Sequence, residues 1–523
     1  MLKKAPQFNF RPLFIAAIFE AIGIGIGGII LKSASGAAVL TASLLLALTV
    51  IFFISSAKDK RLIITAAVAF TVGICAIVIS YRVNYAKAEY VEPRKITGII
   101  YDVSPEQGGT TSYMLRDVTV NGENDIKGNV KLRLHKGYSV YSAGDRIYID
   151  DNIKLTPDSP EFELFSFYQD SGGYTLAEID NKQWLQIDVI DKVKLKVNER
   201  WRDTVRKLIY EKMPEREAGV VVALTIGDKN GIYYEDKDNA IAAGVYHIFA
   251  LSGLHVSFLA AGLFFLLKRL KVNAIVRYCI LIPLIVFYVF VAFYPFSLIR
   301  AAIMLAVSLL AFMLKRKSDP LSTLSFAVIA ILTFCPFALY SLGLSLSVLA
   351  VLGIALFYTS FSKGLSVKER KSKPLNLVTD SAALSLSANS LSVCVMAEVF
   401  GTFPVYFIIA NIIAVPLASV LFSVSAVTVL FTLLFPQTGG ILALTQVVTD
   451  VFISFNMGIA SLPNPLKSIN GLGVFSFVYL INAFILSRYT VWSKKSKLMF
   501  SAVSVIIMLV GLSFTISGVL SGS

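Results

Sequence analysis

The sequence predicts a polytopic α-helical membrane protein with one small all-β domain inserted after its third helix. The 523 residues are 56% hydrophobic and only 16% charged, with a mean hydropathy of +0.71, which is too apolar for a single soluble core. Apolar runs of about 18 residues or more, long enough to cross a bilayer core of about 30 Å, recur along the chain. One region, between residues 82 and 191, breaks this pattern and alternates between apolar and polar residues.

The N-terminal region, residues 1–81, contains three apolar segments near 12–31, 37–57 and 62–80. The first is too long and too evenly apolar for a cleaved signal peptide, and no small-residue cleavage site follows it. We therefore expect it to remain as a membrane helix.

Residues 82–191 are expected to form an extracytoplasmic β domain. Five stretches, at 96–104, 111–122, 128–137, 145–155 and 174–187, alternate with a period near two and are separated by Gly, Asn, Asp and Pro. About five short strands in some hundred residues fit an OB-like barrel, although a fragment of a β-sandwich would give the same pattern.

Residues 192–218 predict an amphipathic, basic linker helix that lies on the membrane surface or on the barrel. The soluble region as a whole has nearly equal numbers of acidic and basic residues, so the net charge of +14 does not by itself indicate nucleic-acid binding. A local track for a polyanion is limited to this linker, with Lys192, Lys194, Lys196, Arg200, Arg202 and Arg206 as candidate contacts.

Residues 219–523 are expected to form a second membrane domain of about ten helices. The candidate spans lie near 244–267, 273–294, 297–314, 321–337, 340–360, 376–398, 403–434, 438–461, 470–487 and 498–518. The stretch 403–434 is long for one straight span and contains Pro416, which favours two half-helices.

The distribution of basic residues predicts the orientation. Clusters of Lys and Arg occur at 3–11, 58–61, 268–277, 315–317, 363–373 and 488–497, whereas the short loops between them on the other side carry only Lys32 and Lys467. Because basic residues are retained on the cytoplasmic side, we expect thirteen spans, with the N-terminus inside and both the β domain and the C-terminus outside.

Polar residues inside the second membrane domain are candidates for a polar path, since burying them in hydrocarbon is unfavourable. The stretch "YHIFALSGLHVSF" holds His247, Ser252 and His255, and Gly253 weakens the helix at the same point. A broken helix that opens into a cavity would explain this pattern. Histidines that merely bond backbone carbonyls near the outer interface would also explain it.

Further candidates for this path are Arg300, Glu398 and Asn411. Arg300 could reach outward to the interface or face a wet interior, where it would attract phosphate. Glu398 could be a simple interfacial carboxylate. Asn411 could satisfy carbonyls freed near Pro416, either as a packing device or as a pore element.

Catalytic and metal sites are not expected. The four cysteines are far apart and lie in apolar runs, and the three histidines form no zinc motif. An intramembrane hydrolase built on Ser252 and His255 would lack an orienting acid and an oxyanion hole. No phosphate-binding loop for ATP is present.

The stretch from "VVALTIGDKNG" to "SGLHVSFLAAGL" closely resembles the signature of the ComEC competence family. The matching residues are Gly244, His247, Ala250, Ser252, Gly253, Leu254, His255 and Val256. The segments "SLIRAAIM" around Arg300, "YSLGLSLSVLAVLGI" around Ser347 and "FPVYFIIANIIAVPL" around Asn411 and Pro416 resemble later blocks of the family. The segments "AGDRIYID" and "FELFSFYQDSGGYTLAEI" resemble its outward-facing OB-like domain.

The resemblance implies a channel, without cofactor, that passes single-stranded DNA through the cytoplasmic membrane during natural transformation. It implies a DNA receptor outside the cell and an ATP-driven translocase inside. Many members end in a metallo-β-lactamase-like domain. This chain ends soon after its last predicted span without that metal motif, so we expect a separate nuclease or a short form of the family. The competing hypothesis is a permease or scaffold for another polyanion or a lipid-linked glycan.

Overall fold

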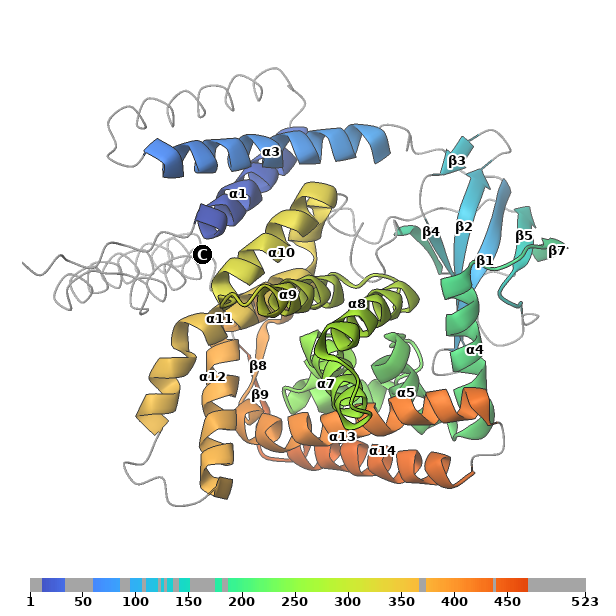
Figure 1. Ribbon diagram of the computed structural model, residues 1–523. Coiled ribbons are helices and arrows are strands. Elements are labelled where there is room, and N and C mark those ends of the chain that lie inside the picture. Colours follow the sequence, from blue (N-terminus) through green and yellow to red (C-terminus); the bar gives the residue numbers. More distant parts are fainter. Residues whose placement is uncertain are drawn as a thin grey trace, which may run out of the picture.

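A computed structural model describes residues 12–32, 60–84, 95–105, 110–120, 124–126, 129–134, 141–150, 175–180, 187–365, 373–435 and 439–468. In these residues the protein is mostly helical, with a small β-sheet at one side of the helical region (Figure 1). The expected spans at 37–57, 470–487 and 498–518 lie outside the described residues.

Five helices are long and apolar enough to cross a membrane among the residues described. They are α8 (Ala274–Val291), α9 (Phe296–Met313), α11 (Leu342–Leu365), α13 (Phe407–Leu434) and α14 (Gly439–Ala460). Shorter apolar stretches occur in α1 (Pro12–Lys32), α3 (Lys60–Asn84) and α10 (Pro320–Phe334). A further long helix, α12 (Lys373–Phe400), packs against α11 and α13.

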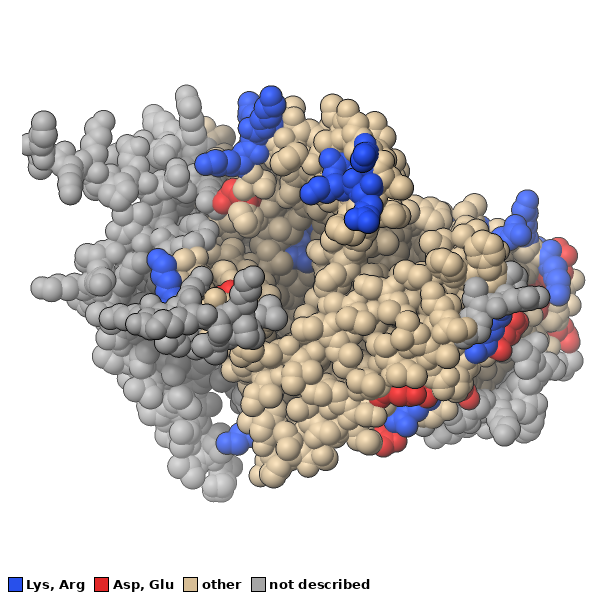
Figure 2. All heavy atoms as spheres, turned by 60° about the horizontal axis from the view of Figure 1, so that its bottom comes forward, with Lys and Arg blue, Asp and Glu red and all other residues tan. Residues whose placement is uncertain are grey.

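Large apolar side chains are exposed on several of these helices, as expected for surfaces that face lipid rather than water. Phe287 of α8, Phe312 of α9 and Phe334 of α10 are examples. In Figure 2 one face of the molecule is largely uncharged, and a hollow near its centre contains a basic side chain. The exposed apolar surface and the helix lengths together support a multi-pass membrane protein.

The structure of residues 403–434 differs from the prediction of two half-helices. It contains one continuous helix, α13, with Pro416 in its interior, so the prediction of two half-helices is wrong. Proline lacks one backbone N–H and usually bends a helix. Here α13 continues for 28 residues, held along one side by buried Ala410, Ala414 and Ala418 in an apolar core.

The β region forms a sheet of the strand order β6-β4-β2-β1-β5-β7, with β3 paired to β2. The strands are β1 (Lys95–Pro105), β2 (Thr111–Val120), β3 (Asn124–Ile126), β4 (Asn129–Leu134), β5 (Asp145–Asp150), β6 (Thr175–Asp180) and β7 (Ile187–Lys192). All neighbouring strands are antiparallel except β4 and β6.

A small β-sheet is present where the sequence predicts strands, but the closed OB-like barrel is not confirmed. Its end strands, β6 and β7, do not pair with each other in the described part of the chain, so the sheet is open. One face holds the core of the domain, where Ile100, Leu115, Leu132 and Ile147 are fully buried. The middle of β1 is buried on both faces, because its other face contacts the next helix, α4.

The linker forms α4 (Val197–Lys212), as the sequence predicts, and α5 (Glu215–Ile226) and α6 (Tyr234–Ala242) follow it. In Figure 1, α4 lies between the sheet and the helical region, and it contacts β1, α5, α8 and α13. This helix therefore fixes where the sheet sits on the membrane domain.

Candidate functional site

The helix that the sequence predicts at 244–267 is broken in its first third. A short 3-10 turn, η4 (Tyr246–Phe249), is separated by residues 250–252 from α7 (Gly253–Arg269). The Leu251 carbonyl at the break accepts a hydrogen bond of 2.5 Å from Ser297 Oγ, which lies in the first turn of α9. The break is thus a defined structure, in which backbone groups that lack helical hydrogen bonds have other partners, rather than a frayed helix end.

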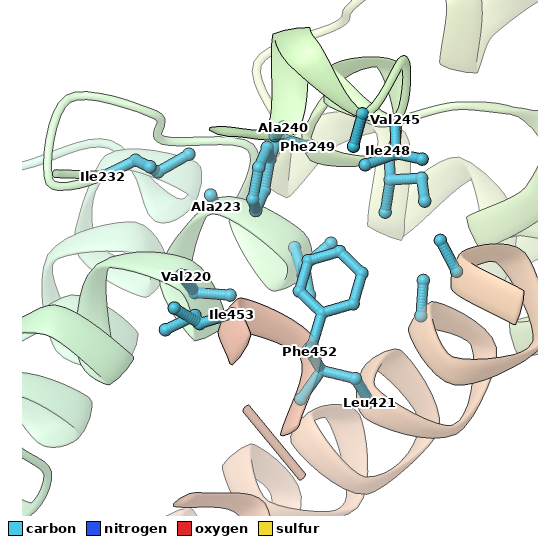
Figure 3. Packing of buried hydrophobic residues seen from close by; sticks show 14 of the residues in the cluster. Val220, Ala223, Ile232, Ala240, Val245, Ile248, Phe249, Leu421, Phe452 and Ile453 are labelled. Atoms are coloured by element: carbon cyan, nitrogen blue, oxygen red, sulfur yellow. The ribbon is translucent and has the colours of Figure 1, made fainter. Parts of the chain in front are cut away.

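The η4 turn is anchored by an apolar core. Phe249 is buried and packs edge-on against Phe452 of α14, with ring centroids 5.9 Å apart. Figure 3 shows Phe249 and Ile248 pointing toward the same core as Leu421 of α13. The break therefore rests on α13 and α14.

Ser252 and His255 cap the start of α7. The Ser252 N–H donates to His255 Nδ1 at 3.2 Å, and the Leu254 N–H donates to Ser252 Oγ at 3.3 Å. This reciprocal pattern is a capping box, with histidine in the position that Glu or Gln usually takes. Because Nδ1 accepts a hydrogen bond, the neutral imidazole carries its hydrogen on Nε2.

His255 is 1% exposed, and its ring packs edge-on against Phe422 of α13 at 4.8 Å between centroids. Although Ser252 Oγ lies 3.3 Å from Nδ1, both atoms take part in the cap. The arrangement therefore supports a positioning role for this pair rather than nucleophilic catalysis.

Gly244 and His247 lie on the other side of the break. Gly244 has a φ of +74°, and a Cβ there would lie 2.8 Å from Pro404 Cγ and 2.9 Å from Phe407 Cβ. Only glycine combines the left-handed backbone with this close approach. The His247 side chain is exposed and bonds the Gly244 backbone, so this histidine, unlike His255, is accessible.

Arg300 and Ser347 meet the break from two other helices. The Arg300 guanidinium of α9 is 4% exposed, and its Nη1 donates to the Ser347 carbonyl of α11 at 3.3 Å. A Cβ on Gly253 would lie 3.2 Å from Arg300 Nη2. The predicted residues Ser252, Gly253, His255, Arg300 and Ser347 therefore form one cluster.

The remaining predicted path residues are not joined to this cluster by a described contact. Asn411 of α13 is buried, and its Oδ1 has no hydrogen-bond partner among the described residues. Pro416 lies on the same helix, which reaches the cluster through Phe422. Glu398 belongs to α12, but its side chain lies outside the described part of the structure.

The basic linker divides into two groups. Lys192, Lys194, Lys196 and Arg200 are exposed. The other two candidates, Arg202 and Arg206, are buried and ion-paired, which leaves their guanidinium groups unavailable to a polyanion at the surface. We therefore leave these two out of the proposed DNA contacts.

Arg206 is the centre of a buried ion-pair network between the sheet and the membrane domain. Its Nη2 lies 2.6 Å from Asp102 Oδ1 of β1 and 2.8 Å from Asp228 Oδ2, in the loop after α5. Ser104 Oγ of β1 donates to the same Asp228 oxygen at 2.8 Å. Arg202 adds a longer contact to Asp102, at 3.4 Å.

The network is electrostatically balanced, with two arginines and two aspartates. Burial alone raises the pKa of Asp228, but Arg206 and Arg202 together with the Ser104 hydrogen bond lower the pKa below its usual value. Burial lowers the pKa of Arg206, but its two aspartates outweigh this effect and raise the pKa. Asp228 and Arg206 are therefore both charged at neutral pH.

The same network extends to the turn that precedes α9. Arg202 lies 4.3 Å from the ring centroid of Phe293, and Tyr101 of β1 packs edge-on against that ring at 5.7 Å. Phe293 and Tyr294 both have positive φ, at 60° and 57°. Asp102, Asp228 and Phe293 were not among the predicted functional residues, because no local pattern in the sequence connects them.

Comparison with known proteins gives two matches. A family model described as "Competence protein" matches residues 224–495. The ComE operon protein 3 of Bacillus subtilis (strain 168) is 30% identical over 210 residues, which cover 39% of this chain and 25% of that protein. The chain therefore spans about a quarter of the curated relative that it matches. No solved structure matches. In the described residues no group of His, Cys, Asp and Glu could hold a metal ion.

Proposed function

Since the chain belongs to the competence protein family, we propose that it is a channel through which single-stranded DNA enters the cell across the cytoplasmic membrane during natural transformation. The observation that carries the proposal is the helix break at 250–252, because it places polar and charged groups of α7, α9 and α11 together inside an apolar membrane domain. Broken helices of this kind are common where a polar substrate passes a membrane protein.

The proposal includes an orientation with the N-terminus inside and the β domain and C-terminus outside, which the Lys and Arg distribution supports. In this orientation η4 and the start of α7 lie toward the outer surface. The sheet lies on the same side. The exposed basic residues at the end of β7, in the segment that follows it and at the start of α4 would meet DNA first; they are Lys192, Lys194, Lys196 and Arg200. A DNA receptor outside and an ATP-driven translocase inside complete the proposed system.

The decisive experiment is deletion of the gene, followed by transformation with purified DNA. We expect DNA uptake to be lost and to return when the full chain is supplied from a plasmid. Internalised labelled DNA should be measured as well as transformants, because this separates entry from later recombination. Normal uptake by the deletion strain would refute the proposal.

A second candidate is a permease or scaffold for another polyanion or a lipid-linked glycan. It is favoured by the nearly balanced charge of the soluble region and by the enclosure of Arg202 and Arg206 in ion pairs. Strong single-strand binders usually combine basic grooves with stacking aromatics, and their affinity falls steeply with salt.

Binding of labelled single-stranded DNA to the purified full chain at several salt concentrations separates the two candidates. The variant with Lys192, Lys194, Lys196 and Arg200 changed to Gln should bind more weakly and show a shallower salt dependence. Equal binding and equal salt dependence of the variant and the wild type would exclude this stretch as the DNA contact.

A further inference from the structure

Arg300 is a buried charge without a counter-charge among the described residues. Arg300 is 4% exposed, yet its hydrogen-bond partners among the described residues are limited to the Ser347 carbonyl at 3.3 Å and the Met304 sulfur at 3.9 Å. Arg300 Nε is fully enclosed and has no partner in the described part of the chain. No described carboxylate lies within ion-pair distance of this guanidinium, in contrast to Arg202 and Arg206.

An isolated buried charge is unfavourable by several kcal/mol even after the surroundings relax. One carbonyl and one thioether offset only part of this penalty, because they carry no net charge. A role limited to linking α9 and α11 would need only a neutral donor, such as the side-chain amide of glutamine. The buried positive charge of Arg300 is therefore best explained by a bound anion that neutralises it.

The N-terminus of α7 lies directly against this guanidinium. Gly253 is the first residue of that 17-residue helix, and a Cβ there would lie 3.2 Å from Arg300 Nη2 and 3.4 Å from Ala301 Cβ. The absence of a side chain on Gly253 therefore lets α9 bring Arg300 to the helix start. Helix N-termini carry partial positive charge and bind phosphate and related anions.

Two independent sources of positive potential thus converge on one point at the helix break. We infer that Arg300 and the N-terminus of α7 form a binding site for a phosphate group, held by the planar fork of the guanidinium and by the helix dipole. If the protein is a DNA channel, as proposed above, the phosphate group is a phosphodiester of the passing strand; this part of the inference rests on the proposed function. A phosphate group of a lipid headgroup has the same chemistry.

The site itself is tested without DNA. The purified full chain in detergent is heated in sodium phosphate and in sodium chloride of matched ionic strength, and unfolding is followed by tryptophan fluorescence. Phosphate should raise the unfolding midpoint of the wild type and, to a smaller extent, of Arg300→Lys, which keeps the charge but loses the fork. It should not raise the midpoint of Arg300→Gln.

A matched control is Arg277→Gln, which removes another partly buried arginine, one that packs over Phe264 at 4.6 Å rather than at the break. This variant should keep the phosphate effect. An equal effect of phosphate on the wild type and Arg300→Gln, or no effect on the wild type, would overturn the inference.

The source of the phosphate is tested with oligonucleotides. A labelled oligothymidylate should bind the wild type in phosphatidylcholine nanodiscs about tenfold or more tightly than it binds Arg300→Gln, and an oligonucleotide with an uncharged methylphosphonate backbone should not distinguish the two proteins. Loss of this difference in phosphatidylglycerol nanodiscs would identify a lipid headgroup as the occupant of the site. An equal affinity of both proteins for the phosphodiester in phosphatidylcholine would exclude DNA as the occupant.

These outcomes separate the site from the proposed function. If transformation is unaffected by deletion of the gene but phosphate still stabilises only proteins with a cation at position 300, the site stands and the uptake proposal fails. If deletion abolishes uptake while Arg300→Gln takes up DNA and responds to phosphate like the wild type, the site fails and the uptake proposal stands.

Discussion

Replacement of His255 by alanine should destabilise the helix break rather than remove a DNA contact. The imidazole is 1% exposed, accepts the Ser252 N–H through Nδ1 and packs against Phe422. It therefore acts on the start of α7 and on the contact between α7 and α13.

The magnitude follows from these two contacts. Loss of the hydrogen bond leaves the partly buried Ser252 N–H without this acceptor, which is unfavourable by about 1–3 kcal/mol. Loss of the edge-on ring contact removes about 0.5–1.5 kcal/mol. His255→Ala should therefore lower the free energy of unfolding by about 2–4 kcal/mol.

The most informative comparison is His255→Gln, because glutamine is a usual residue at this position of a capping box and offers an acceptor to the same N–H. We expect it to keep the cap and lose only the ring contact. His247→Ala is the control for an exposed histidine: it loses the bond to the Gly244 backbone but no capping contact, and it should lower stability less than His255→Ala. Equilibrium unfolding in mixed detergent and SDS micelles gives the stability, and uptake of labelled DNA gives the function.

Stability and uptake should fall together in His255→Ala and recover together in His255→Gln. A His255→Ala protein with wild-type stability but without DNA uptake would refute the reasoning, because the imidazole would then act on DNA and not on the helix.

Three further predictions concern other parts of the protein. Asp228→Asn should lower the free energy of unfolding by about 3–5 kcal/mol, since Arg206 keeps Asp102 as a partner but the buried network of Arg202, Arg206 and Asp102 is left with an unbalanced positive charge. Trp201 fluorescence on α4 reports the loss. The pKa of Asp228 is lower in the folded than in the unfolded protein. Its contribution to folding stability should therefore be complete at pH values above the unfolded pKa of about 4 and be lost as the pH falls through the folded pKa. A melting temperature independent of pH between 6 and 3 would contradict this. Gly244→Ala should reduce the amount of folded protein in the membrane, because its Cβ would contact Pro404 and Phe407 at under 3 Å in a strained backbone; wild-type levels by immunoblot would be inconsistent with the close contact. In a background without the native cysteines, Lys237→Cys should react with an impermeant maleimide in intact cells and Lys317→Cys only after permeabilisation, and the reverse pattern would overturn the proposed orientation.

The sequence predicted the helical and strand elements well wherever local periodicity determines them. Helices α8, α9, α13 and α14 begin within a few residues of the predicted spans, because a bilayer imposes a minimum length on any apolar helix. The strands followed from alternation with a period of two. The pairing of strands depends on contacts distant in sequence, so the expectation of a closed barrel was not confirmed.

The candidate site was predictable only in part. Gly253 and the nearby histidines gave a local signal, a polar cluster in an apolar run, and the break lies there. The partners that define the chemistry came from elsewhere: Ser297 and Arg300 from α9, and Ser347 from α11. For Arg206, the basic pattern suggested a surface track, but its partner Asp102 is 104 residues away and draws the side chain into the interior. A single sequence carries no local signal of such a partner.

Helix α9 is the element that the sheet and the helix break share. In the turn before it, the backbone of Phe293 is held in a left-handed conformation. This conformation is unfavourable by about 1–2 kcal/mol for a residue other than glycine. Such a conformation persists only when its surroundings determine it, and here Tyr101 of β1 and Arg202 of α4 enclose the ring. One turn later the same helix supplies Ser297 to the Leu251 carbonyl, and then Arg300 to the start of α7. The position of the sheet therefore bears on the position of the charge at the break through a continuous series of packed contacts.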